Sequence, residues 1–119
     1  MAEVRFKRST IRRFMEKHYP GCPPRNRKAI VYAVGRRPWV DATIGKAVGI
    51  VVTNHVRHKM TLYETWMRDY GLTREEARAA EASTVGDIVR SWREAKSPAD
   101  VPITRIVTIV RRPGSNSPD

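Results

Sequence analysis

The chain has one cysteine, no long apolar run and no apolar leader, and each shortage excludes a class of protein. Its single thiol, Cys22, cannot form an internal disulfide, which excludes a disulfide-stapled secreted domain. The longest apolar run is AVGIVV, whereas a membrane span needs about 18 or more apolar residues. The first residues, MAEVRFKRST, lack the apolar segment of a secretion signal. Together these features predict a cytoplasmic protein with no membrane segment.

The signatures of common enzymes and metal sites are also missing. No GxSxG, HExxH or P-loop pattern occurs, so no familiar nucleophile or nucleotide site is recognisable. Four side chains have spacings that a zinc ion could use, namely His18, Cys22, His55 and His58. The paired CxxC of zinc ribbons is absent, however, and inward histidines on helices are more often held by hydrogen bonds. The sequence therefore predicts neither a metal nor a cofactor.

Positive charge is abundant and unevenly distributed. The 119 residues include 23 Lys and Arg against 12 Asp and Glu, which gives a net charge of +11. Residues 1–40 hold 11 basic and 2 acidic side chains, whereas residues 71–100 hold 5 and 6. Such a surplus attracts polyanions through electrostatic steering and counterion release, so DNA or RNA is the predicted partner. The alternative is a basic face that only keeps the protein soluble.

Apolar spacing predicts a mainly α fold, a compact bundle of four to five helices in one domain. The first helix, 9–18, should begin at Ser9 or Thr10 and bury Ile11, Phe14, Met15 and His18. The second, about 26–34, should stop at Gly35. The third, about 42–57, should be capped by Asp41 and turn His55 and His58 inward.

Two capping boxes predict the last helices. Thr61 with Glu64 should open a short helix that ends at Gly71, and Thr73 with Glu76 should open a long helix to about residue 96. The buried face predicted for the long helix is Ala77, Ala80, Thr84, Ile88 and Trp92.

The two ends of the chain look strand-like. VPITRIVTIVRR at 101–112 is rich in β-branched residues, and EVRF at 3–6 is the other candidate strand. A lone strand is unstable, so we expect these two to pair, within one chain or across a homodimer. The predicted domain spans 1–112, and 113–119 should be a disordered tail.

Three functions remain open. The leading one is nucleic-acid binding, with contacts mainly to phosphates and little sequence reading. Its predicted residues are cations on exposed helix faces and turns, plus one aromatic side chain to stack on a base: Arg12, Arg13, Lys17, Arg25, Arg27, Lys28, Arg36, Arg37 and Trp39. The second is an interaction module in which this basic face binds an acidic partner protein, with Trp39 as an anchor.

The third is a metal-free ribonuclease that uses His55, His58, Tyr63 and Arg78 as base, acid and phosphate clamp. A buried polar network is the favoured explanation of that set. Residues 62–80 also have the outline of a helix-turn-helix, but the second helix would begin with more acid than base, and phosphates would repel it. We therefore expect an ordinary helical hairpin at residues 62–80. For the protein as a whole, we expect a binding role rather than an enzymatic one.

Residues 51–93, from VVTNHVRHKM to SWR, resemble the core of a bacterial and fungal family, domain of unknown function 2293. The matching positions are His55, Arg57, His58, Thr61, Tyr63, Gly71, Arg74, Ala77, Arg78 and Trp92. Glu64 stands where the family has aspartate, and TWM replaces a leucine pair. With a less specific upstream piece the resemblance covers about 11–93, and it implies a fold rather than an activity. Short basic chains of this kind also resemble phage-encoded proteins.

Overall fold

The computed structural model describes residues 2–101, which form five α-helices and a two-stranded sheet. The elements in chain order are β1 (Glu3–Val4), α1 (Arg8–His18), α2 (Pro24–Gly35), β2 (Trp39–Val40), α3 (Ile44–Met60), α4 (Tyr63–Tyr70) and α5 (Arg74–Glu94), followed by a 3₁₀ turn at Pro98–Asp100. The prediction of a mainly α fold with four to five helices is confirmed for these residues.

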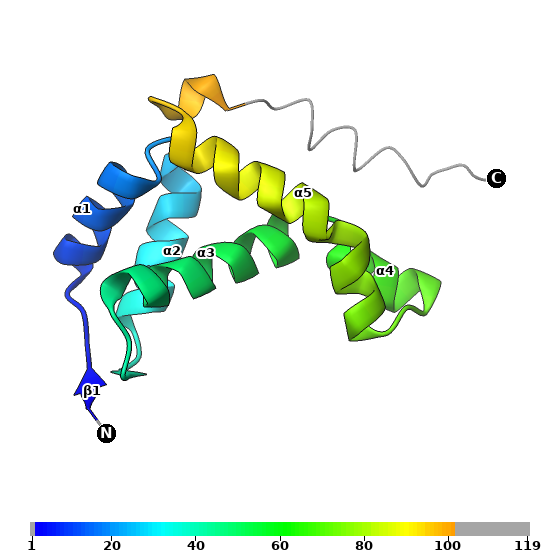
Figure 1. The fold of residues 1–119 in the computed structure, drawn as a ribbon, viewed down its shortest axis with the longest axis horizontal. Coiled ribbons are helices and arrows are strands. Elements are labelled where there is room, and N and C mark those ends of the chain that lie inside the picture. Colours follow the sequence, from blue (N-terminus) through cyan, green and yellow to red (C-terminus); the bar gives the residue numbers. More distant parts are fainter. Residues whose placement is uncertain (1, 102–119) are drawn as a thin grey trace.

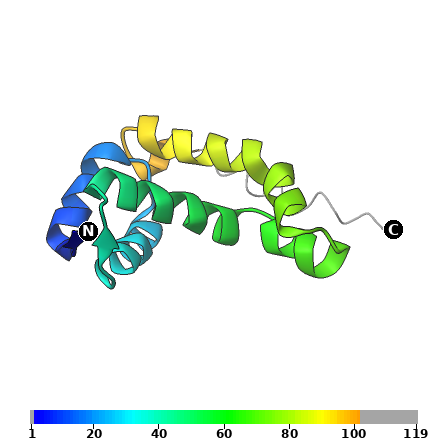
Figure 2. The ribbon, with the colours of Figure 1, turned by 60° about the horizontal axis from the view of Figure 1, so that its bottom comes forward.

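The helices form two connected groups along the molecule. At one end α1, α2 and the start of α3 lie against one another, and at the other end α4 folds back on the start of α5 (Figure 1). Helices α3 and α5 run alongside each other between these ends, in two layers (Figure 2). The long helices therefore join the basic first third of the chain to the more acidic last third.

One hydrophobic core joins α1, α2, α3 and α5. Its fully buried side chains are Ile11, Met15, Cys22, Ile30, Val34, Ala47, Val48, Val52, Val56 and Trp92. The loop after α1 approaches the end of α5 closely, and the amide of Gly21 donates to the carbonyl of Trp92 at 2.8 Å. A Cβ at Gly21 would lie 2.7 Å from the Cβ of Ala95, so this approach requires glycine. Ile11 and Met15 on α1 are buried, as predicted.

Two predicted helix starts were wrong. Helix α1 begins after Lys7, which makes no side-chain cap, rather than at Ser9 or Thr10. Helix α3 is capped by Thr43, whose hydroxyl accepts from the amide of Lys46 at 3.2 Å. Asp41, the predicted cap, instead has a positive φ of 51° and accepts a hydrogen bond from the amide of Ala2. Its carboxylate is thus used to hold the N-terminal strand.

Only one of the two capping boxes forms. Thr73 and Glu76 exchange hydrogen bonds at the start of α5, as predicted. At α4 the N-cap is Leu62 without a side-chain bond, so the box of Thr61 with Glu64 was wrong. The Thr61 hydroxyl donates to the carbonyl of Arg57 and accepts from the amide of Tyr63, because the chain turns directly out of α3. Gly71 ends α4 in the left-handed conformation, as predicted.

The buried face of α5 differs from the predicted one at its centre. Ala77, Ile88 and Trp92 are buried as expected, but Ala80 is exposed and Thr84 is half-buried. Glu81 and Val85 are buried in their place. Glu81 is only 3% exposed because the indole Nε1 of Trp66 on α4 donates to its carboxylate at 2.5 Å. A hydrogen bond between α4 and α5 therefore accompanies the burial of Glu81 at the centre of this face.

The strand near the N-terminus forms, but with another partner. Glu3 and Val4 pair antiparallel with Val40 and Trp39, so β1 lies against β2. The sequence did not predict β2. The strand predicted at 101–112 and the tail predicted at 113–119 lie outside the described residues, apart from Val101, which follows the 3₁₀ turn.

Candidate nucleic-acid interface

Helix α2 lies between two basic grooves. The first, which we call the α1–α2 groove, has a volume of about 460 Å³. Its lining residues are Arg8, Arg12, Pro24, Arg27, Lys28, Val31 and Tyr32. Four of the seven are cations and none is acidic, because the outward faces of α1 and α2 carry basic residues while their apolar residues turn into the core.

The second groove, the α2–α3 groove, opens on the other side of α2. It has a volume of about 320 Å³ and is lined by Ala29, Ala33, Arg36, Arg37, Val51, Asn54, His55, His58 and Lys59. Three of these side chains are permanent cations, and again none is acidic. Cations therefore line the grooves on both sides of α2.

The structure distributes the predicted cations over several surfaces. Arg12, Arg27 and Lys28 line the α1–α2 groove, and Arg36 and Arg37 line the α2–α3 groove. The others, Arg13, Lys17 and Arg25, are exposed but line neither groove. Within residues 2–101, the arginines and lysines that form ion pairs are Arg68 and Arg90. All eight predicted cations are therefore without a carboxylate partner in the described part of the chain.

The prediction that Trp39 is exposed was wrong. The side chain is 6% exposed, and its indole Nε1 donates to the carbonyl of Val34 at 3.0 Å. The guanidinium carbon of Arg37 lies 3.7 Å from the centre of its ring. Because Trp39 sits in β2 and points into the core, it is not available in this structure to stack on a base or to anchor a partner.

Tyr32 is the aromatic side chain that the sequence reading missed. It is 53% exposed, lines the α1–α2 groove, and has the guanidinium of Arg8 at 5.2 Å from its ring centre. The signal was present in the sequence, since Arg25, Lys28, Tyr32 and Arg36 recur at spacings of three and four and so share one helix face. Arg8 and Lys59 were also missed as lining cations.

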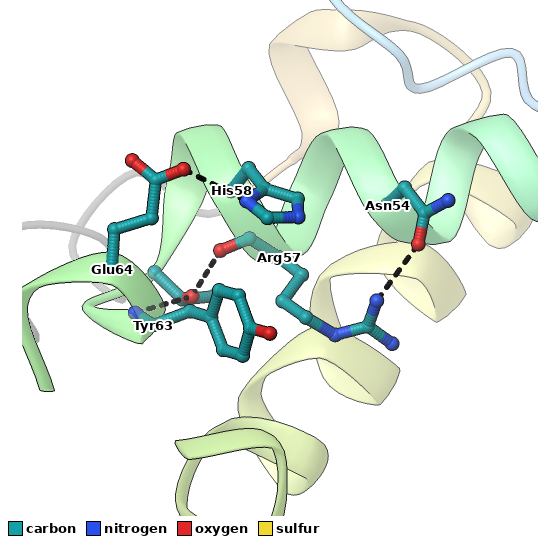
Figure 3. Close-up of polar contacts among 6 residues, drawn as sticks. Asn54, Arg57, His58, Tyr63 and Glu64 are labelled. Carbon is teal, nitrogen blue, oxygen red and sulfur yellow. Dashed lines mark hydrogen bonds and ion pairs between the residues drawn. The ribbon is translucent and has the colours of Figure 1, made fainter. Parts of the chain in front are cut away.

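His58 faces solvent, contrary to the prediction that it turns inward. Its side chain is 41% exposed, and its Nδ1 lies 2.9 Å from a carboxylate oxygen of Glu64 (Figure 3). The ring also meets the ring of Tyr63 edge-on at 4.9 Å. His58 lies on the exposed side of the last turn of α3, where Glu64 at the start of α4 reaches the imidazole.

His55 is half-buried in the wall of the α2–α3 groove, so the inward prediction holds in part. The side-chain amide of Asn26 donates to its Nε2 at 2.9 Å. Burial, and then the nearby charge of Lys59, lower the pKa of His55 below its ordinary value. Both effects disfavour the protonated ring.

The four residues predicted for a ribonuclease do not share one groove. His55 and His58 line the α2–α3 groove, whereas Arg78 lines other grooves with Arg57, on the side of α3 that faces α5. Tyr63 is buried at 2% exposure, and its ring lies near the ring of His58 and the side chain of Arg57 (Figure 3). The Arg57 guanidinium donates to Asn54 at 2.8 Å. These contacts join α3 to α4 and order the end of α3.

Acid should destabilise the fold through His55. The pKa of this ring is lower in the folded chain than its ordinary 6.5, so the unfolded chain binds more protons near that pH. Its contribution to stability is therefore complete above pH 6.5 and is lost as the pH falls toward the folded pKa. In His55→Gln, which keeps an acceptor for Asn26 but cannot titrate, urea unfolding between pH 7.5 and about pH 5 should depend less on pH.

The matched control for that measurement is His18→Gln. His18 is exposed and stacks on Phe14 with ring centres 4.2 Å apart, which also corrects the prediction that it is buried. This variant shows what the removal of an exposed imidazole does to the same measurement. An unchanged pH dependence in His55→Gln would contradict the assignment.

The four side chains whose spacing a zinc ion could use do not form a metal site in the structure. Within residues 2–101 no three His, Cys, Asp or Glu side chains come together in a group that could hold a metal ion. Cys22 is fully buried, and burial raises the pKa of its thiol to about 12. Its Sγ faces the carbonyl of Pro23 at 3.6 Å. Cys22 is thus a core residue of this fold.

Comparisons with known proteins agree with the resemblance noted above. Among the described residues, no helix is both long enough and apolar enough to cross a membrane. No curated protein matches the chain, and no solved structure matches it. One family model, described as "Uncharacterized conserved protein (DUF2293)", matches residues 14–93. This span runs from α1 to the last turn of α5 and covers more than half of the sequence. The chain therefore belongs to the DUF2293 family.

Proposed function

We propose that the protein binds nucleic acid with the two grooves beside α2, mainly through contacts to phosphates. One observation carries this proposal: seven cations line the two grooves, and no acidic side chain lines either of them. Cations of a soluble surface are usually interspersed with acids. A run of unneutralised cations is instead typical of a surface that meets a polyanion.

The charge of the remaining surface favours the same side of the molecule. Helix α5 contains four arginines and five acidic residues, and its first turns expose Arg74, Glu75, Glu76 and Arg78. A phosphate backbone would be repelled there about as much as it would be attracted. The α4–α5 hairpin is accordingly a poor candidate for a helix that enters the major groove.

The chemistry of the two grooves supports binding with little sequence preference. Their cations lie on long side chains, and phosphate contacts carry no sequence information by themselves. Side-chain amides, which read adenine in pairs of hydrogen bonds, are represented in these linings only by Asn54. We therefore expect similar affinities for unrelated sequences of one length.

The affinity should fall steeply with salt. If five to seven of the lining cations each displace a counterion, the slope of log affinity against log salt is about −4 to −6 for duplex DNA. Fluorescence anisotropy with a labelled duplex at 50 to about 200 mM salt measures this slope. A slope near zero would show that phosphates do not carry the binding.

Replacing Tyr32 with alanine should weaken single-strand binding more than duplex binding. An unpaired base can stack on this exposed ring, and such a contact is worth about 1–3 kcal/mol. The bases of an intact duplex stay stacked on one another, so duplex affinity should change little. Tyr70→Ala is the matched control, because Tyr70 is 51% exposed but lies on α4 against Trp66. Equal losses in the two variants would rule out stacking at Tyr32.

A further inference from the structure

A third groove lies between α3 and α5, away from α2. It is larger than the two basic grooves, at about 880 Å³. Its lining residues are Thr53, Arg57, Arg78, Ala79, Ala82, Val85, Gly86, Val89, Arg90, Arg93 and Glu94. Its floor is formed by small and apolar side chains of α5, and its rims carry arginines. We call it the α3–α5 groove.

The floor follows a second stripe of α5, distinct from the face that α5 buries in the core. Ala79, Ala82, Gly86, Val89 and Arg93 recur at alternating spacings of three and four. That spacing is typical of a helix that meets another helix along its length. The first three are exposed and Val89 is half-buried. Helix α5 thus has a helix-pairing stripe to which the described chain supplies no complete partner.

Gly86 gives an independent indication. Glycine in the interior of a helix is destabilising relative to alanine. A Cβ at this position would meet nothing within 4 Å, so the fold itself does not require its absence. With Ala82 and Ala79 it leaves a shallow surface on which the backbone of another helix can approach closely. Packing among the described residues therefore does not account for a glycine at this position.

The charged side chains on the rims of the groove indicate which charge a helix bound there should carry. Four arginines and one glutamate line the groove, and Arg90 also donates to Asp87 at 3.2 Å. A second copy of this chain would bring a net charge of +11, and residues 102–119 carry three arginines and one aspartate. Both are disfavoured by like charge. A nucleic-acid duplex has the right charge, but its bases stay stacked on one another and offer no apolar face to cover the floor.

We propose that the α3–α5 groove binds an acidic amphipathic helix of a partner protein. Its apolar side lies on the stripe of Ala79, Ala82, Gly86 and Val89, and its carboxylates meet Arg57, Arg78 and Arg90. This surface is separate from the α2 grooves, so the proposal does not depend on nucleic-acid binding. The protein would then connect a polyanion on one side to a protein partner on the other.

A designed peptide tests the proposal on the full chain. The probe has three heptads, with leucine at positions a and d and glutamate at e and g, so that its own charge opposes self-association. Anisotropy should detect binding of this peptide and about tenfold or more weaker binding of a scrambled peptide of the same composition. Gly86→Leu should fill the groove and weaken binding about tenfold or more, with the fold intact. Ala80→Leu is the matched control, because Ala80 is exposed on α5 but does not line the groove.

Each outcome bears on the proposal. Loss of binding in Gly86→Leu and in Arg78→Ala with Arg90→Ala, but not in Ala80→Leu, supports it. Equal binding of the scrambled peptide would overturn it in favour of simple charge attraction. Dimerisation of the free protein that Gly86→Leu abolishes would assign the groove to a second copy. Loss of duplex DNA affinity in Gly86→Leu would assign it to nucleic acid and would equally overturn the proposal.

Discussion

Reversing the charge of Arg12 and Lys28 together should weaken binding of duplex DNA by about 100-fold at low salt. Two unit charges 4 Å apart in water interact by about 1 kcal/mol, and reversal replaces that attraction with a repulsion of the same size. Two reversals therefore change the binding free energy by up to about 4 kcal/mol, and ionic screening reduces this to about 3 kcal/mol, or about 100-fold. Both side chains are exposed and line the α1–α2 groove, so R12E/K28E should leave the fold intact.

The control for that experiment makes the same change in net charge at the α3–α5 groove. Arg78→Glu with Arg90→Glu alters two exposed arginines of the α3–α5 groove. It should reduce DNA affinity by far less, through the net charge of the molecule alone, while abolishing binding of the acidic peptide. Comparable losses of DNA affinity in the two double variants would contradict a localised interface and would indicate attraction to the molecule as a whole.

Replacing Trp92 with alanine should lower the free energy of unfolding by about 3–5 kcal/mol. Its side chain is fully buried in the core shared by α1, α2, α3 and α5, and its backbone carbonyl accepts from the amide of Gly21. A domain of this size typically has about 5–15 kcal/mol of stability, so this single change should remove a large share of the total. Urea titration followed by circular dichroism measures the change.

Trp92→Phe is the informative companion. The indole Nε1 has no hydrogen-bond partner among the described residues, and a buried unpaired donor costs free energy. Phenylalanine removes that donor and keeps an aromatic ring, so its cost should be less than half that of alanine. A loss as large as that of Trp92→Ala would show that the N–H group contributes to stability, and the unpaired assignment would be wrong.

Helix positions were predictable wherever the apolar spacing and the capping residues of a single segment were sufficient to define the helix. Ile11 and Met15 face the core because their spacing matches one helix face, and Thr73 caps α5 because its partner Glu76 lies within the same turn. Predictions failed where a side chain had a choice of partners from elsewhere in the chain. Asp41 binds the amide of Ala2, and Glu64 binds His58, so neither caps the helix beside it. The spacing within a single helix carries no information on these competing partners.

The candidate site was predictable in kind but not in arrangement. Arginine and lysine side chains are rarely buried without a partner, so their exposure follows from residue type. Which of them share a groove depends on how α1, α2 and α3 lie against one another, and local patterns do not encode this. Trp39 shows the same limit, since its burial depends on the pairing of β2 with β1. Tyr32 was recoverable, because its outward position follows from helix periodicity alone.

The buried thiol of Cys22 can be used to detect opening of the fold. Cys22 is inaccessible in the closed molecule, and its pKa of about 12 keeps it protonated and unreactive even if a reagent came near. Alkylation can therefore proceed only in molecules in which the core around Cys22 has opened. The rate at which Cys22 is alkylated therefore measures how often the fold opens. A ligand that holds the helices together should lower this rate, and no engineered probe is needed to detect it.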